Sequence, residues 1–163
     1  MQIHDLPGGD AIALRLWNTG QRLGAGFDSH LAAAGGSRYT FYVFSAIDRL
    51  STPSQRDLAR AVGVDDATIT HHLAAMEREG LIERTRAAED RRILRVTLTA
   101  VGVTLWAALN DAVDRYNESQ LAGLSPDELE RLGELLDRID SNSERMLAVA
   151  PPRAGSVTAP GSR

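Results

Sequence analysis

The chain has 163 residues, of which 43% are hydrophobic and 25% are charged, and its formal net charge at pH 7 is -4. These values are typical of one globular domain with a real core. No apolar run approaches the roughly 18 residues of a membrane span, and the N-terminus lacks the charged and apolar regions of a signal peptide, so we expect a cytoplasmic protein with no membrane partner. The absence of cysteine excludes disulfides and thiol-based sensing.

The first third of the chain predicts two helices. Residues 10–34 form the first, and its apolar positions recur at core-like spacing: Ile12, Leu16, Leu23, Phe27 and Leu31. Three glycines, Gly20, Gly24 and Gly26, each weaken this helix by up to about 1 kcal/mol against alanine. Ser37 is a candidate cap for the second helix, over residues 38–50, which ends at a Ser-Thr-Pro break.

Two short helices joined by a turn follow. Ser54 and Asp57 predict a capping box for the first, whose apolar stripe ends where Gly63 breaks the helix. Asp65 is expected to cap the second, and Gly80 supplies its left-handed stop. Its expected inward positions are Ala67, Ile69, Leu73 and Met76, while Thr68, Thr70, His71, Ala75 and Arg78 fall largely elsewhere on the helical wheel. A helix presented in this way can enter a major groove.

After Gly80 the hydrophobic period changes from about 3.6 to 2, which predicts a small hairpin of residues 81–86 and 93–98 around a polar loop. This segment is locally positive in an acidic chain, because it carries five arginines: Arg84, Arg86, Arg91, Arg92 and Arg95. Such a patch is a candidate for phosphate or minor-groove contact.

The C-terminal third predicts two more helices. Thr99 starts a long one with Val103, Leu105, Trp106, Leu109, Val113, Tyr116 and Leu121 in its apolar stripe. Ser125 and Glu128 form a second capping box, with proline at the first helical position, for a last helix through Leu129, Leu132, Leu136, Ile139 and Met146. Residues 150–163 are rich in Pro, Gly, Ala and Ser, and we expect a disordered tail.

The order and spacing of these motifs resemble the MarR family of bacterial winged-helix regulators. The resemblance rests on residues 55–59, 68–70, 77–82 and 90–92 with the Leu98-Thr99 and Gly102 that follow. It implies a mainly α fold with a small β wing, in which a winged helix-turn-helix is flanked by N- and C-terminal dimerisation helices. The implied boundaries are 1–36 and 100–149 for the helical dimerisation region, 37–99 for the DNA-binding region and 150–163 for the tail.

The same resemblance implies a sequence-specific regulator of transcription, a repressor that binds double-stranded DNA. Expected DNA-binding residues are Gln55, Arg56, Thr68, Thr70, His71, Arg84, Arg86, Asp90, Arg91 and Arg92. In the family an acid at the wing orients an arginine into the minor groove, and these positions match Asp90 and Arg92. Asp65 and Asp66 depart from the family, in which many members carry serine and a basic or neutral residue, and two outward carboxylates would repel a nearby phosphate.

The terminal helices carry more apolar surface than a small wing domain needs, so we expect them to pack together and against a second copy. The resulting C2 homodimer would place its recognition helices roughly 34 Å apart and would read a near-palindromic operator. The alternative is a monomeric helical bundle.

In related regulators a cleft between the dimer helices and the wing domain binds small aromatic or anionic compounds that release DNA. Candidate effector-binding residues are Trp17, His30, Arg38, Tyr39 and Tyr42, with the basic groups as partners of an anion and the rings as walls. The alternative for each ring is a place in the core.

No enzyme motif is found: there is no P-loop, dinucleotide fingerprint, nucleophile elbow or HExxH. His71 and His72 diverge by about 100 degrees on a helix and cannot share a metal from one face, and no cofactor or metal site is predicted. The alternative function is a winged-helix fold reused as an enzyme or binder for a small aromatic metabolite, with Asp65, Asp66 or a histidine as acid or base.

Overall fold

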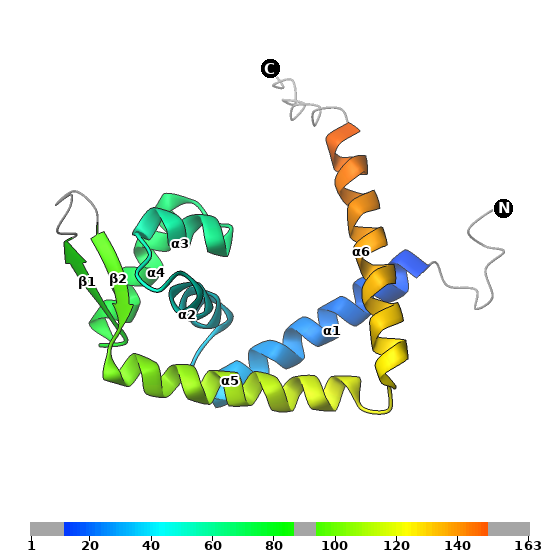
Figure 1. Ribbon diagram of the computed structural model, residues 1–163, viewed down its shortest axis with the longest axis horizontal. Coiled ribbons are helices and arrows are strands. Elements are labelled where there is room, and N and C mark those ends of the chain that lie inside the picture. The colour runs from blue at the N-terminus through cyan, green and yellow to red at the C-terminus, as the bar shows by residue number, and fades with distance from the viewer. Residues whose placement is uncertain (1–11, 87–93, 150–163) are drawn as a thin grey trace, which may run out of the picture. The chain divides into compact units, whose positions relative to one another are not determined.

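The computed structural model describes residues 12–86 and 94–149 (Figure 1). In these ranges the chain forms six helices and two strands: α1 (Ile12–Ala33), α2 (Arg38–Leu50), α3 (Gln55–Val62), α4 (Asp66–Arg78), β1 (Ile82–Arg86), β2 (Leu94–Leu98), α5 (Ala100–Leu121) and α6 (Pro126–Val149). The fold is mainly α with a small β wing, as predicted. Two predicted features, the tip of the wing with Asp90, Arg91 and Arg92 and the tail 150–163, lie outside the described residues.

The wing is an antiparallel pair in which Ile82 lies opposite Leu98 and Arg86 opposite Leu94. A short extended segment before α3 joins its open edge, because Ser54 forms a bridge with Arg95 and the Val96 N–H donates to the Pro53 carbonyl at 3.0 Å. The wing is therefore tied to the start of the helix-turn-helix by backbone hydrogen bonds.

Capping residues define the ends of the helices that the sequence predicted. Ser37 accepts a hydrogen bond from the Thr40 N–H, and Asp65 accepts one from the Thr68 N–H. Ser54 and Asp57 form the complete capping box of α3. Gly63 and Gly80 have φ angles of 76° and 69°, the left-handed conformation that glycine adopts at little cost. These predictions are confirmed.

The core lies between α2, α3, α4 and the wing, and α1 and α5 each add an apolar residue to it. Its largest fully buried side chains are Phe44, Leu31, Leu58, Ile69, Leu73, Ile82, Leu109, Val43 and Val96. Burial of Ile69, Leu73 and Met76 fixes the rotation of α4 about its own axis. The opposite face of α4 is therefore turned outward.

Two expectations about burial are wrong. Ala67 was expected to face inward but is exposed, because it lies in the first turn of α4, ahead of the buried residues. Along α1 only Leu31 is buried, while Ile12 and Leu23 are 42% and 39% exposed. α1 thus carries more apolar side chains than the single chain buries.

The described residues up to Leu121 form one compact unit, and those from Ala122 form a second that contains α6. Ser125 and Glu128 cap α6 as predicted, since the Ser125 N–H donates to the Glu128 carboxylate at 2.8 Å. The helix is amphipathic and leaves its apolar side chains uncovered, among them Leu132, Leu136 and Ile139. Among the described helices, none is long and apolar enough to cross a membrane.

Candidate nucleic-acid interface and ligand cavities

The outward face of α4 carries three of the predicted DNA-binding residues. Thr70 and His71 are exposed and Thr68 is half-buried, all in the first half of the helix. The hydroxyl of Thr70 donates to the Asp66 carbonyl and accepts a hydrogen bond of 2.6 Å from the Gln55 side-chain amide. This contact links the start of α3 to α4, so two predicted contact residues are brought together. Arg56, beside Gln55, is exposed.

Asp65 is turned toward its own helix. One of its carboxylate oxygens accepts the Thr68 N–H at 2.7 Å, and hydrogen bonds from Thr68 lower the pKa of Asp65. The carboxylate is therefore ionised at neutral pH and serves as the N-cap, where the helix dipole favours a negative charge. Asp66 lies in the first turn and is exposed.

The two adjacent histidines of α4 have different surroundings. His71 is exposed, whereas His72 is half-buried and its ring stacks on that of Tyr39, with a centroid distance of 4.2 Å and an interplanar angle of 20°. Tyr39 belongs to α2, so this stack joins the first turn of α2 to the middle of α4. A displacement of α2 would therefore change the packing of His72 in α4.

The described arginines of the wing fall into two classes. Arg84 forms a two-atom ion pair with Glu77 of α4, in which its Nε lies 3.0 Å from the carboxylate. This hydrogen bond raises the pKa of Arg84 and lowers that of Glu77. Arg86 is exposed at the end of β1, and Arg95 donates to the Thr52 carbonyl at 3.2 Å. Arg84 is thus already paired with a carboxylate of the protein.

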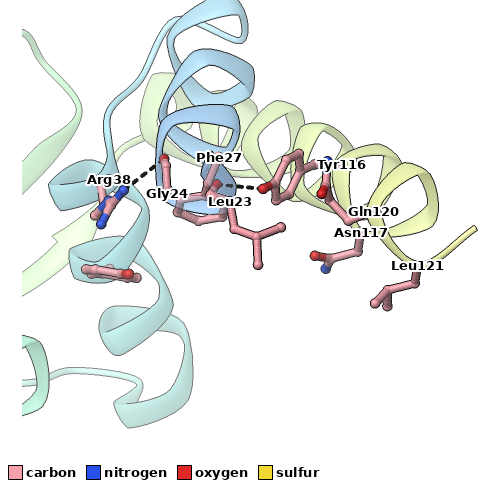
Figure 2. Close-up of a pocket in the computed structure, with 9 residues that line it drawn as sticks. Leu23, Gly24, Phe27, Arg38, Tyr116, Asn117, Gln120 and Leu121 are labelled. Carbon is pink, nitrogen blue, oxygen red and sulfur yellow. Dashed lines mark hydrogen bonds between the residues drawn. The ribbon is translucent and has the colours of Figure 1, made fainter. Parts of the chain in front are cut away.

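Two of the cavities beside α2 are lined by Arg38. The first, here called the α5 cavity, has a volume of about 360 Å³ and lies among α1, α2 and α5 (Figure 2). It is lined by Leu23, Gly24, Phe27, Arg38, Tyr42, Tyr116, Asn117, Gln120 and Leu121. The second, here called the turn cavity, has a volume of about 590 Å³ and is lined by Asp28, Ser37, Arg38, Tyr39, Tyr42, Val62, Gly63 and Val64. Arg38 and Tyr42 contribute to both.

The wall between α1 and α5 is closely packed. The Tyr116 hydroxyl donates to the Leu23 carbonyl at 2.6 Å, as Figure 2 shows. A Cβ at Gly26 would lie 2.9 Å from the Tyr116 ring, so this approach requires glycine. The glycines that weaken α1 as an isolated helix therefore include one that lets it dock.

Residues 41–94, which include α3, α4 and β1, match the model of the MarR family. Over these residues the chain resembles the MarR family. The match contains the capping box of α3 and the outward face of α4, so it falls on the helix-turn-helix described above.

Solved structures share this fold over most of the chain. A probable transcriptional regulator from Pseudomonas aeruginosa is 29% identical, with 80% of this chain and 97% of that chain covered and a TM-score of 0.68. The transcriptional repressor CouR, bound to a 23-mer DNA duplex, is 25% identical, with coverage of 79% and 92% and a TM-score of 0.71. BpsR of Bordetella bronchiseptica, whose DNA binding is regulated by 6-hydroxynicotinic acid, is 24% identical, with coverage of 80% and 99% and a TM-score of 0.67.

The α5 cavity and the turn cavity contain only part of the predicted effector set. Arg38, Tyr39 and Tyr42 line them, but Trp17 and His30 line neither. Trp17 is 66% exposed near the start of α1, and His30 packs its ring against Tyr116 at a centroid distance of 5.0 Å. Trp17 precedes the part of α1 that lines the cavities, whereas His30 follows it directly and reaches the α5 cavity only through its contact with Tyr116.

Sequence reasoning missed the contribution of α5 to the α5 cavity. Tyr116 was assigned to the apolar stripe, and Asn117 and Gln120 were not singled out. The contact that places them is between residues 93 apart in sequence, which no local pattern reveals. Within the described ranges no group of three or more His, Asp or Glu residues could hold a metal ion.

Proposed function

We propose that the protein is a homodimeric, sequence-specific transcription regulator that acts as a repressor on a near-palindromic operator and is released by a small aromatic ligand. The observation that carries this proposal is the outward face of α4, with Thr68, Thr70 and His71, set on the buried Ile69 and Leu73. The resemblance to the MarR family and a fold shared with a DNA-bound repressor support it.

On the DNA, α4 would enter the major groove, where Thr70 and His71 read base edges or adjacent phosphates. Gln55 and Arg56 would hold the backbone at the start of α3. Arg86 and Arg91 of the wing would contact phosphates, and Arg92, oriented by Asp90, would reach the minor groove. Arg84 would act indirectly, by fixing the wing to α4 through Glu77.

A second copy of the chain would bury the exposed apolar side chains of the terminal helices. Residues 1–36 and 100–149 remain the proposed dimerisation region, since α1, α5 and α6 carry exposed apolar side chains, including Leu14, Val101, Val103 and Leu136. A two-fold axis would then set the recognition helices roughly 34 Å apart, on successive major grooves.

Ligand release would act through α2. A molecule in the α5 cavity contacts Arg38 and Tyr42 of α2, and the Tyr39–His72 stack joins α2 to α4. By linkage, a ligand that weakens DNA binding must itself bind DNA-bound dimer more weakly by the same factor.

Two arginines of the wing, Arg86 and Arg84, provide the test. The DNA probe is the promoter region next to the protein's own gene, and affinity is measured by fluorescence anisotropy over a range of salt concentrations. Arg86→Ala should lower affinity and reduce the slope of log K against log salt by about 0.9, as for the loss of one phosphate contact. The matched variant Arg84→Ala should leave that slope nearly unchanged, because Arg84 is paired with Glu77.

His71→Ala tests base recognition in the same assay. It should weaken binding to the promoter more than binding to random DNA of equal length. No binding of the wild-type dimer to any tested DNA would contradict the proposal. Retained binding of an aromatic compound would then favour the small-metabolite binder or enzyme.

A further inference from the structure

The α5 cavity has apolar walls and a single charged group. Among its nine described lining residues, Leu23, Phe27 and Leu121 are apolar, and Arg38 is the only one with a formal charge. Tyr42, Asn117 and Gln120 offer uncharged hydrogen-bonding groups, both donors and acceptors. The electrostatic environment of a ligand in this cavity therefore depends on how the charge of Arg38 is paired.

Most of the hydrogen-bonding capacity of Arg38 is already used. Its Nε donates to one oxygen of Asp28 at 2.8 Å, and its Nη2 donates to the other oxygen at 2.9 Å. The same Nη2 donates to the Gly24 carbonyl at 2.9 Å (Figure 2). Of the five N–H groups of the guanidinium, three are thus engaged and the two on Nη1 are left.

The backbone of α1 at Gly24 lies close to Arg38. A Cβ there would lie 3.2 Å from Nη2 of Arg38, tighter than an ordinary contact. The guanidinium is therefore held against α1, side by side with Asp28, by the shape of the backbone as well as by the ion pair. The two charges cancel where the ligand would lie.

We propose that the α5 cavity selects an uncharged, flat, hydrogen-bonding ligand, and that Asp28 is the residue that imposes this selection. A carboxylate that approached Arg38 would face a cation already neutralised in a two-point ion pair and would feel the negative charge of Asp28 behind it. An amide or hydroxyl group can instead accept from Nη1 and bond to Asn117 or Gln120 at no electrostatic cost. This inference rests on the proposed function, in which the same cavity holds the effector, and replaces the expected anion with a neutral compound.

Asp28 can be changed without removing a wall of the α5 cavity. It lies on α1 and lines the turn cavity, not the α5 cavity. Asp28→Asn keeps the size of the side chain and an oxygen that can accept from Arg38, but it removes the negative charge. The variant should turn the cavity from neutral to cationic.

The experiment compares two probes of matched shape, 2-naphthamide and 2-naphthoate, binding to the purified full-length protein without DNA at neutral pH and low salt. Affinity is measured by isothermal titration calorimetry and by naphthyl fluorescence. The wild type should bind the amide at least about fivefold more tightly than the carboxylate. In Asp28→Asn the carboxylate should gain at least about fivefold, while the amide changes less than about twofold.

Two further variants make the result specific. Asp48→Asn removes the same charge from an exposed position on α2 and should leave both affinities unchanged. Adding Arg38→Gln to Asp28→Asn should abolish the gain for the carboxylate. The ion pair is partly exposed, with side-chain exposures of 39% for Arg38 and 53% for Asp28. High salt should therefore reduce the difference between the affinities for the amide and for the carboxylate.

The inference is overturned if the wild type binds neither probe, prefers the carboxylate, or shows the same preference after Asp28→Asn. Thermal unfolding of each variant establishes that it is folded. Failure of the proposed function would give a different result. If the wild type prefers the amide but binds DNA equally well when it is saturated with the amide, the charge selection of the cavity stands and only the proposed ligand release is wrong.

Discussion

At the scale of single residues, the hydrogen bond between Gln55 and Thr70 joins the two helices of the helix-turn-helix. Gln55→Ala and Thr70→Val each remove it, so their effects on the free energy of unfolding should not add. We expect a coupling of about 0.5 to 1 kcal/mol in a double-mutant cycle followed by urea unfolding. Thr70→Ser keeps the hydroxyl and should preserve the coupling with Gln55→Ala. Additive effects would mean that the bond is absent in solution.

Gly102 shows how a single missing side chain allows α5 to dock. A Cβ there would lie 2.0 Å from the Leu81 carbonyl oxygen, a backbone atom that also accepts the Thr99 N–H at 3.1 Å. Gly102→Ala should therefore lower the free energy of unfolding by about 1 to 3 kcal/mol, measured by urea unfolding.

Gly20 is the matched control for Gly102, since it also lies inside a helix but has no neighbour within 4 Å of a built Cβ. Gly20→Ala should stabilise the protein by up to about 1 kcal/mol, through helix propensity alone. Equal effects of the two substitutions would show that the close approach at Gly102 is not present.

At the scale of elements, the capping box of α3 makes stability depend on pH. The Ser54 hydroxyl and backbone N–H, which donate to Asp57 at 2.6 Å and 2.9 Å, hold the pKa of Asp57 below its usual value. The folded pKa is below the unfolded one, so this contribution is present above the unfolded pKa and is lost as pH falls through the folded pKa. Stability should therefore decline in acid, below about pH 4.

Asp57→Asn tests this dependence. It should lower stability at neutral pH and make the decline below about pH 4 shallower, measured by urea unfolding at each pH. Asp48→Asn, an exposed carboxylate of α2 for which the described residues provide no hydrogen bond, is the control and should keep the wild-type decline. An unchanged acid limb in Asp57→Asn would contradict the assignment.

At the scale of the whole molecule, the apolar face of α6 has no cover within its own unit. Leu132, Leu136 and Ile139 are 40%, 44% and 39% exposed, which is unusual for three large apolar residues on one helical face. If this face joins the proposed dimer, Leu136→Glu should raise the dimer dissociation constant at least about tenfold and weaken operator binding with it. Sedimentation velocity over a range of concentrations measures the first effect.

Ser141→Glu adds the same charge to α6 about 140° away from Leu136 around the helix, and it should leave the dimer intact. Loss of the dimer in both variants would indicate that charge on α6, not its apolar face, controls assembly. A wild type that stays monomeric at all concentrations would favour the monomeric bundle.

The sequence by itself determined the elements and their ends. Ser54, Asp65 and Ser125 cap helices through contacts that reach only three residues along the chain, and the change of hydrophobic period after Gly80 follows from backbone geometry. Such interactions join residues that are close together in the sequence, so a local sequence pattern is enough to predict them. The order of the motifs was then enough to suggest the MarR family, which the family model supports over residues 41–94.

The tertiary structure alone decided which partner each functional group takes. Arg38 pairs with Asp28, ten residues away, and Arg84 pairs with Glu77, seven away, so each of these cations already has an acidic partner within the protein. The Tyr116 hydroxyl meets the Leu23 carbonyl across 93 residues and so brings α5 to the ligand cavity. The sequence shows which charged and aromatic residues are available and on which helical face they lie. Only the packing of the helices brings opposite charges within hydrogen-bonding distance, because that distance depends on how the elements of the chain are arranged in space.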